Sequence, residues 1–114
     1  MKISITPLDR LFARYVKARD KVCQRCGSYS KYLQTCHFHS RRKRSTRWDE
    51  ENSCLLCAGC HLYLDGNPLE HTEFMVKRLG QEEFDNLNIR ANWRGKTDLE
   101  MVKIYIQAKL KEIK

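Results

Sequence analysis

The sequence predicts a small α+β domain in which helices at both ends flank a centre that contains strands. Three observations lead to this prediction: helical spacing of apolar residues near each end, a β-compatible segment in the middle, and two cysteine pairs that bracket this segment. A chain of 114 residues can form only a limited core, which a structural metal would help to hold together. We therefore expect one domain over residues 1–114, with an N-terminal helix (6–20), a core (23–67) and a C-terminal helical cover (69–114).

The N-terminal segment has the features of a helix start. Thr6 can cap the helix, Pro7 suits its first position, and Asp9 lies where the helix dipole favours a negative charge. Apolar residues then recur at helical spacing, namely Leu8, Leu11, Phe12, Tyr15 and Val16. We expect these residues to face the core.

The C-terminal half is predicted to be mainly helical. A helix over 69–79 should stop at Gly80, and the helical tendency resumes over 82–87. Residues 88–96 read as a connecting loop that carries Trp93. The residues Thr97-Asp98-Leu99-Glu100 form a capping box that opens the last helix, whose inward residues are Leu99, Val102, Ile106, Leu110 and Ile113.

The central segment is predicted to contain the strands. Residues 29–39 are rich in aromatic and β-compatible side chains and should form one strand. Alternation along it would place His37 and His39 on one face and Cys36 on the other. Residues 48–56 supply a second strand or a turn with a buried end, and residues 61–65 suit a short helix that ends at Gly66.

The composition limits the functions to consider. Lys and Arg outnumber Asp and Glu by 22 to 14, a net charge of +8, which attracts polyanions such as nucleic acids. The same excess is also compatible with an ordinary basic surface. We see no signal peptide or membrane span, so we expect a cytoplasmic protein with no membrane partner. In that reducing compartment, six cysteines favour metal binding over disulfides.

Two C-x-x-C pairs predict a structural zinc site. Cys23 and Cys26 form the first pair and Cys57 and Cys60 the second, with a glycine beside the second thiol of each. Two residues between thiols let both sulfurs face one ion, and four thiolates complete a tetrahedral Zn²⁺ site. A redox C-x-x-C is the alternative, but a second matched pair argues against it. The residues between the pairs would then form the functional insert.

Within this insert, His37, Asn52 and His61 follow one another in the order His, Asn, His. The pieces CHFHSRR, TRWDEEN and CLLCAGCH resemble the HNH endonucleases, especially their zinc-knuckled phage group. This resemblance covers residues 23–67 and implies a ββα-metal core, in which a β-ribbon and a helix hold a catalytic divalent cation. A weaker likeness to the NinG recombination proteins continues through residues 74–80 and the last helix.

The HNH resemblance implies three roles. His37 would be the general base that takes a proton from the attacking water, for which imidazole suits neutral pH. Asn52 would brace the ribbon and orient the base, and His61 would bind the catalytic cation. The alternatives are a packed strand histidine for His37, a turn asparagine for Asn52, and an unused ligand beside the zinc for His61.

The residue before the base departs from the family pattern. HNH proteins often have Asp or His there as a metal ligand, whereas this chain has Cys36. Because a thiol is softer than the ligands Mg²⁺ prefers, either Cys36 is only buried or the site accepts Mn²⁺ or another transition ion. Asp65 or His39 could complete the ligand set instead.

A basic run follows the first strand. Its cationic residues can clamp a DNA backbone or form a solvated loop; they are Arg41, Arg42, Lys43, Arg44 and Arg47. Trp48 can stack on a base, although we favour packing beneath the loop. His71 lies outside the motif, and we interpret it as a surface or packing residue.

We therefore predict a bacterial or phage-encoded DNA endonuclease that uses structural Zn²⁺ and catalytic Mn²⁺ or Mg²⁺. As a monomer or weak homodimer, it would nick one strand at a time. The alternative is a non-catalytic zinc-stabilised module that binds nucleic acid as a recombination or packaging accessory. A redox or zinc-sensing protein is a third possibility.

Overall fold

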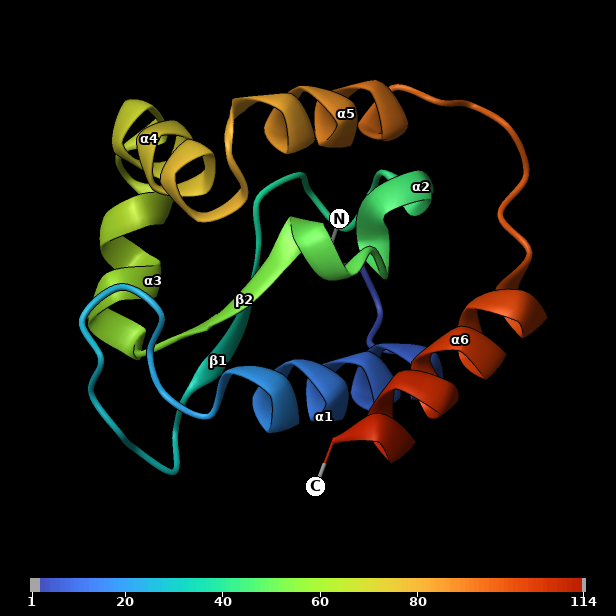
Figure 1. Ribbon diagram of the computed structural model, residues 1–114, viewed down its shortest axis with the longest axis horizontal. Helices are drawn as coiled ribbons and strands as arrows, with labels where there is room; N and C mark the ends of the chain where they lie inside the picture. Colours follow the sequence, from blue (N-terminus) through green and yellow to red (C-terminus); the bar gives the residue numbers. More distant parts are fainter. Residues whose placement is uncertain (1–2, 114) are drawn as a thin grey trace.

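The computed structural model describes residues 3–113 as an α+β arrangement of helices around a two-stranded antiparallel ribbon (Figure 1). Two helices, α1 and α6, lie on one side of the ribbon, and α5 lies on the opposite side (Figure 1). The elements in order are α1 (Pro7–Asp20), β1 (Gln34–His37), α2 (Arg44–Arg47), the 3-10 turn η1 (Glu50–Asn52), β2 (Ser53–Leu56), α3 (Ala58–Asp65), α4 (Pro68–Leu79), α5 (Gln81–Ala91) and α6 (Leu99–Glu112). The predicted α+β class is confirmed, whereas the ββα-metal core stays a prediction.

Helix α1 begins as predicted. The Thr6 hydroxyl accepts a hydrogen bond from the Asp9 backbone N–H, and the Asp9 carboxylate accepts one from the Thr6 N–H, which makes a complete capping box. Phe12 and Val16 are almost fully buried and pack with Ile106 of α6. The two terminal helices therefore pack against each other although they are far apart in the sequence.

The ribbon is shorter than the predicted strand over residues 29–39. In β1, Gln34 pairs with Leu56 and His37 pairs with Ser53. Pairing cannot extend past Gln34 because the next partner, Cys57, already caps α3, and Tyr29 and Tyr32 are left exposed. On β2, Leu55 packs toward α1 and Leu56 toward α3, so both faces of this strand are buried.

The basic run does not form the predicted loop throughout. Its last residues, Arg44–Arg47, form the one-turn helix α2, and Arg47 is buried with its guanidinium 2.6 Å from the Asp9 carboxylate. Trp48 is also buried, and its indole N–H donates to the Asp9 carboxylate at 3.0 Å. Trp48 thus packs beneath this segment, as predicted.

Three helix boundaries in the C-terminal half differ from the prediction. Helix α3 begins at Ala58 rather than at residue 61, because the Cys57 sulfur accepts a hydrogen bond from the Cys60 N–H and caps the helix. Helix α5 continues to the buried Ala91, so the connecting loop starts only at residue 92. The cap of α6 is Asp98, which accepts from the Met101 N–H.

Helix α4 stops at Gly80, as predicted, and the positive φ of 86° at this residue suits glycine. Helix α6 buries Ile106, with Val102, Leu110 and Ile113 partly buried against the same cluster. None of the helices within residues 3–113 combines the length and apolar character needed to span a bilayer.

Candidate functional site

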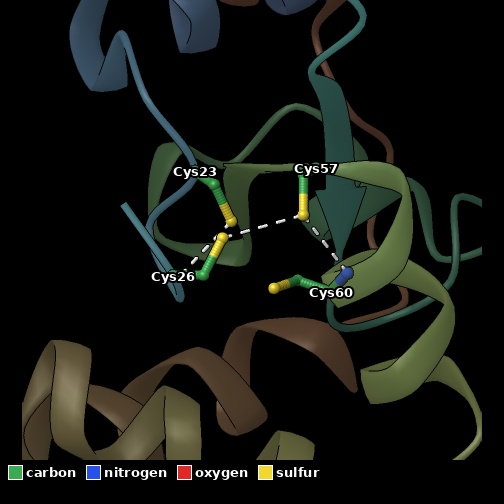
Figure 2. Close-up of side chains that lie close together, drawn as sticks. All are labelled: Cys23, Cys26, Cys57 and Cys60. Carbon is green, nitrogen blue, oxygen red and sulfur yellow. Dashed lines mark hydrogen bonds between the residues drawn. The ribbon is translucent and has the colours of Figure 1, made fainter. Parts of the chain in front are cut away.

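The four predicted zinc cysteines converge at one end of the ribbon. Cys23 and Cys26 lie in the loop after α1, whereas Cys57 and Cys60 lie at the start of α3, and all four sulfurs are within 4.8 Å of one another (Figure 2). The first loop turns at Gly27, whose φ is 76° and whose N–H donates to the Cys23 carbonyl. Among residues 3–113, every cysteine is a free thiol.

The spacing and surroundings of these sulfurs fit a tetrahedral metal. An ion about 2.3 Å from each sulfur would hold the sulfurs roughly 3.8 Å apart, and the Cys26 and Cys57 sulfurs are separated by 3.8 Å. The backbone N–H groups of Cys26 and Cys60 point at the sulfurs of Cys23 and Cys57, at 3.5 and 3.4 Å. The cluster can therefore hold a structural metal such as zinc.

The protonation of these thiols also suggests a bound cation. Hydrogen bonds with Ser28 lower the pKa of Cys26 to about 6, whereas burial raises the pKa of Cys60 to about 12. Thiolates held this close repel one another, so a central cation is needed for all four to be ionised together. The Arg25 guanidinium donates to the Cys60 sulfur at 3.4 Å and would stabilise its negative charge.

A second group of ligand-type side chains lies along α3. Ligand atoms of Cys36, His61 and Asp65 are all within 4.8 Å of one another. His61 Nδ1 is 2.7 Å from the Gln34 side-chain oxygen, which can only accept, so Nδ1 is the donor and leaves Nε2 as the nitrogen for a metal ion. Nε2 lies 3.4 Å from the Asp65 carboxylate. Gln34 therefore orients His61 in the way that outer residues orient metal ligands.

Cys36 of this group is buried on β1. Burial raises the pKa of its thiol well above the usual range, so the sulfur is protonated unless a cation binds beside it. His71 Nε2 lies 4.0 Å from this sulfur, and the His71 ring packs edge-on against Phe38. Of the two interpretations of His71, a surface or a packing residue, its buried position supports packing, but its position beside Cys36 was missed. No local pattern signals this position, because it depends on how α4 packs beside β1.

His37 faces an open groove of about 420 Å³ that His61, Asp65, Arg41 and Arg42 also line. His37 Nε2 lies 3.0 Å from the Arg47 backbone carbonyl, which can only accept. Nε2 is therefore protonated, and Nδ1 carries the lone pair. Burial lowers the pKa of His37 to about 4, so the ring is neutral at physiological pH.

This burial predicts how His37 titrates. The unfolded chain should bind the proton near pH 6.5 and the folded chain only near pH 4. His37 should therefore stabilise the fold fully above pH 6.5, and this contribution should be lost as the pH falls through 4. An NMR titration of the His37 ring should show a midpoint near 4, and a midpoint near 6.5 would contradict the buried position.

Asn52 braces the end of the ribbon. Its side chain is fully buried, accepts from the His39 N–H at 2.8 Å, and donates to the carbonyls of His39 and Thr46 at 3.1 and 3.0 Å. It thereby links the residues after β1 to α2, from which the Arg47 carbonyl contacts His37. A turn asparagine would not need this set of bonds.

His39 points away from the group around His61. Its Nε2 lies 2.7 Å from the Asn88 side-chain oxygen on α5, so it contacts α5 rather than Cys36 or Asp65. Strand alternation predicted His37 and His39 on one face. Because β1 ends at His37, His39 lies outside the strand and this alternation does not apply to it. Of the additional cation ligands considered, the structure brings Cys36 and Asp65 to His61.

The five basic residues separate into two sets. Arg47 is bound to Asp9 and to the Ser4 carbonyl, and Arg41 donates to the same two residues at 3.4 and 2.8 Å. Arg41 keeps part of its surface at the groove, whereas Arg47 is buried. The exposed residues of the run are Arg42, Lys43 and Arg44.

Comparison with known proteins identifies the family. The family model of the bacteriophage lambda NinG protein matches residues 3–114, far beyond the segment that resembles the HNH endonucleases. Neither the curated proteins nor the solved structures give a match. The NinG likeness, the weaker one in the sequence, is thus confirmed, and the HNH resemblance stays a prediction. The chain belongs to the phage NinG family.

Proposed function

We propose that this NinG-family protein is a metal-dependent DNA endonuclease that nicks one strand. The observation that carries the proposal is the shared groove, which His37 lines together with His61 and Asp65. A neutral histidine with a free lone pair, a cluster of metal ligands and basic side chains are the parts that phosphodiester hydrolysis requires. Their arrangement at one end of a β-ribbon and along the following helix agrees with the HNH resemblance.

In the proposed reaction, His37 Nδ1 accepts a proton from a water molecule as the water oxygen attacks the phosphorus. The Arg47 carbonyl accepts the hydrogen bond from His37 Nε2 and thereby leaves Nδ1 as the nitrogen that takes this proton. The bond from phosphorus to the 3′ oxygen breaks, and this oxygen takes a proton from solvent. The products are a 5′-phosphate and a 3′-hydroxyl, as the HNH resemblance implies.

A divalent cation held by His61, Asp65 and Cys36 would supply charge stabilisation to the phosphate and the leaving oxygen. The mixed sulfur, nitrogen and oxygen donors favour Mn²⁺ or another transition ion over Mg²⁺. Arg41 and Arg42 at the rim of the groove would contact phosphates.

The family match favours a second candidate. The sequence resembles the NinG recombination proteins, and a recombination accessory could use the zinc site and the basic surface without cleaving DNA. Such a protein would need the four zinc cysteines and the exposed basic residues but would not depend on His37. Mutation of His37 therefore distinguishes the two functions.

His37→Ala should reduce nicking of supercoiled plasmid by about 10²- to 10⁴-fold, because it removes the general base. His37→Asn tests the same role while keeping a donor for the Arg47 carbonyl. The matched control is His39→Ala, which removes a nearby histidine that points at Asn88 instead of the groove. Nicking should be measured with Mn²⁺ and Mg²⁺ in turn, together with zinc content and DNA affinity.

Loss of nicking in both His37 variants, with the control active and zinc and DNA binding unchanged, would support the endonuclease. Equal nicking by His37→Asn and the unmutated protein would reject His37 as the base. If the unmutated protein binds DNA but cuts nothing with either cation, the accessory function is the better description.

A further inference from the structure

A second groove lies beside the proposed cleavage groove, and Arg42 lines both. Its volume is about 340 Å³, and it runs between the start of α2 and the loop that follows α5. The two grooves thus meet along the basic run. The residues lining the second groove are Arg42, Lys43, Arg44, Ser45, Ala91, Asn92, Trp93, Arg94 and Gly95.

Trp93 presents a large aromatic surface in this groove. Its side chain is 57% exposed, whereas Trp48, the other tryptophan of the chain, is only 7% exposed. The indole lies against Gly95, where any side-chain carbon would overlap the ring. Glycine at this position therefore lets the indole rest on the backbone and leaves its surface open to solvent.

The walls around Trp93 are positively charged. Arg44 and Arg94 are exposed, and within residues 3–113 neither makes an ion pair or a hydrogen bond. Among the described residues, the Lys43 ammonium donates only to the neutral Asn92 side chain, at 3.2 Å. No acidic residue lines the groove. By contrast, Arg90 on α5 is paired with Asp49 and Glu51, so neutralised arginines do occur nearby.

We propose that this groove is an accessory nucleic-acid site in which Trp93 stacks on one unstacked base while Arg44 and Arg94 hold the adjoining phosphates. A ligand that consists only of phosphates would gain no binding energy from the exposed indole, whereas every nucleobase has a flat face that can stack on it. Because Arg42 lines both grooves, this site lies next to the His37 groove, and we expect one nucleic-acid strand to occupy both. The inference rests on the proposed function in that nucleic acid is the ligand of both grooves.

The two tryptophans make the inference testable by fluorescence. Without added divalent cation, titration with single-stranded oligothymidylate should quench the emission of the unmutated protein. Trp93→Phe should bind oligothymidylate without this quenching, because only the buried Trp48 would still emit. An abasic oligodeoxyribose phosphate of equal length should bind more weakly and leave the emission unchanged.

Affinity provides the second readout. Trp93→Ala should weaken oligothymidylate binding by about 5- to 150-fold, the range that corresponds to one stacked base. Trp93→Phe should keep most of the affinity because a ring remains. The matched control is Tyr32→Ala, which removes an exposed aromatic side chain from the loop before β1 and should change nothing.

Oligothymidylate binding without quenching, or equal affinity of Trp93→Ala and the unmutated protein, would overturn the stacking site and leave the proposed function intact. Failure of every oligonucleotide to bind would reject the stacking site, whereas the proposed function is tested separately by nicking of supercoiled plasmid. If the His37 variants lose plasmid nicking while Trp93→Ala keeps it, the cleavage chemistry is separate from the stacking site.

Discussion

Replacement of Cys57 by serine should release the structural metal and unfold the central ribbon. Binding of structural zinc is worth about 10–16 kcal/mol in small zinc modules, which is comparable to the total stability of roughly 5–15 kcal/mol of a folded domain. Cys57 also caps α3 and directly follows β2, so its loss removes the link between the loop after α1 and the ribbon. Zinc analysis and far-UV circular dichroism would measure both effects.

The matched control for this variant is Cys54→Ala. Cys54 is a buried cysteine of β2 that lies outside the group of four, so zinc should stay bound at one per chain. Chelation of the metal from the unmutated protein should reproduce the Cys57→Ser result. A folded Cys57→Ser protein that keeps its zinc would show that the four sulfurs do not form the metal site.

Asp9→Ala should destabilise the protein by about 3–5 kcal/mol, because it leaves the buried Arg47 guanidinium without its counter-charge. Burial alone would raise the pKa of Asp9, but hydrogen bonds from Arg47 and Thr6 hold it well below its usual range. The same carboxylate accepts the Trp48 indole N–H. Urea denaturation at neutral pH would measure the loss.

Thr6→Ala is the control for the capping part of this effect. It removes the side-chain cap of α1 but keeps the ion pair of Asp9 with Arg47, and it should cost about 1 kcal/mol. If Asp9→Ala costs no more than Thr6→Ala, the ion pair adds nothing to stability. A larger cost for Asp9→Ala would identify Asp9 as the anchor of the basic run.

Local signals were sufficient to predict where α1 begins, where α4 ends and which four cysteines lie together. The capping box of Thr6 and Asp9 and the turn at Gly80 depend on residues a few positions apart, so their geometry can be predicted from short-range chemistry. The geometry of each C-x-x-C motif can be predicted in the same way, because two residues between thiols determine how the sulfurs of one pair are placed. The extent of β1 could not be predicted this way, since its length depends on where β2 turns into α3.

The roles of individual polar residues depended on long-range packing. Arg47 has the same local signature as Arg44, yet Arg47 is buried on Asp9 and Arg44 is exposed. His39 turns to Asn88, and His71 approaches Cys36, because α5 and α4 pack against the end of the ribbon. Nothing within a few residues of these side chains specifies such partners.

The sequence by itself thus determined that the chain is α+β, that its terminal segments are helical, and that four cysteines can meet at one ion. Only the tertiary structure decided that Cys36 and Asp65 join His61, that Arg47 is buried on Asp9, and that an exposed Trp93 stands in a basic groove. The physical reason is that helix caps and cysteine pairs act over a few residues, whereas ligand groups and grooves form where distant elements pack together.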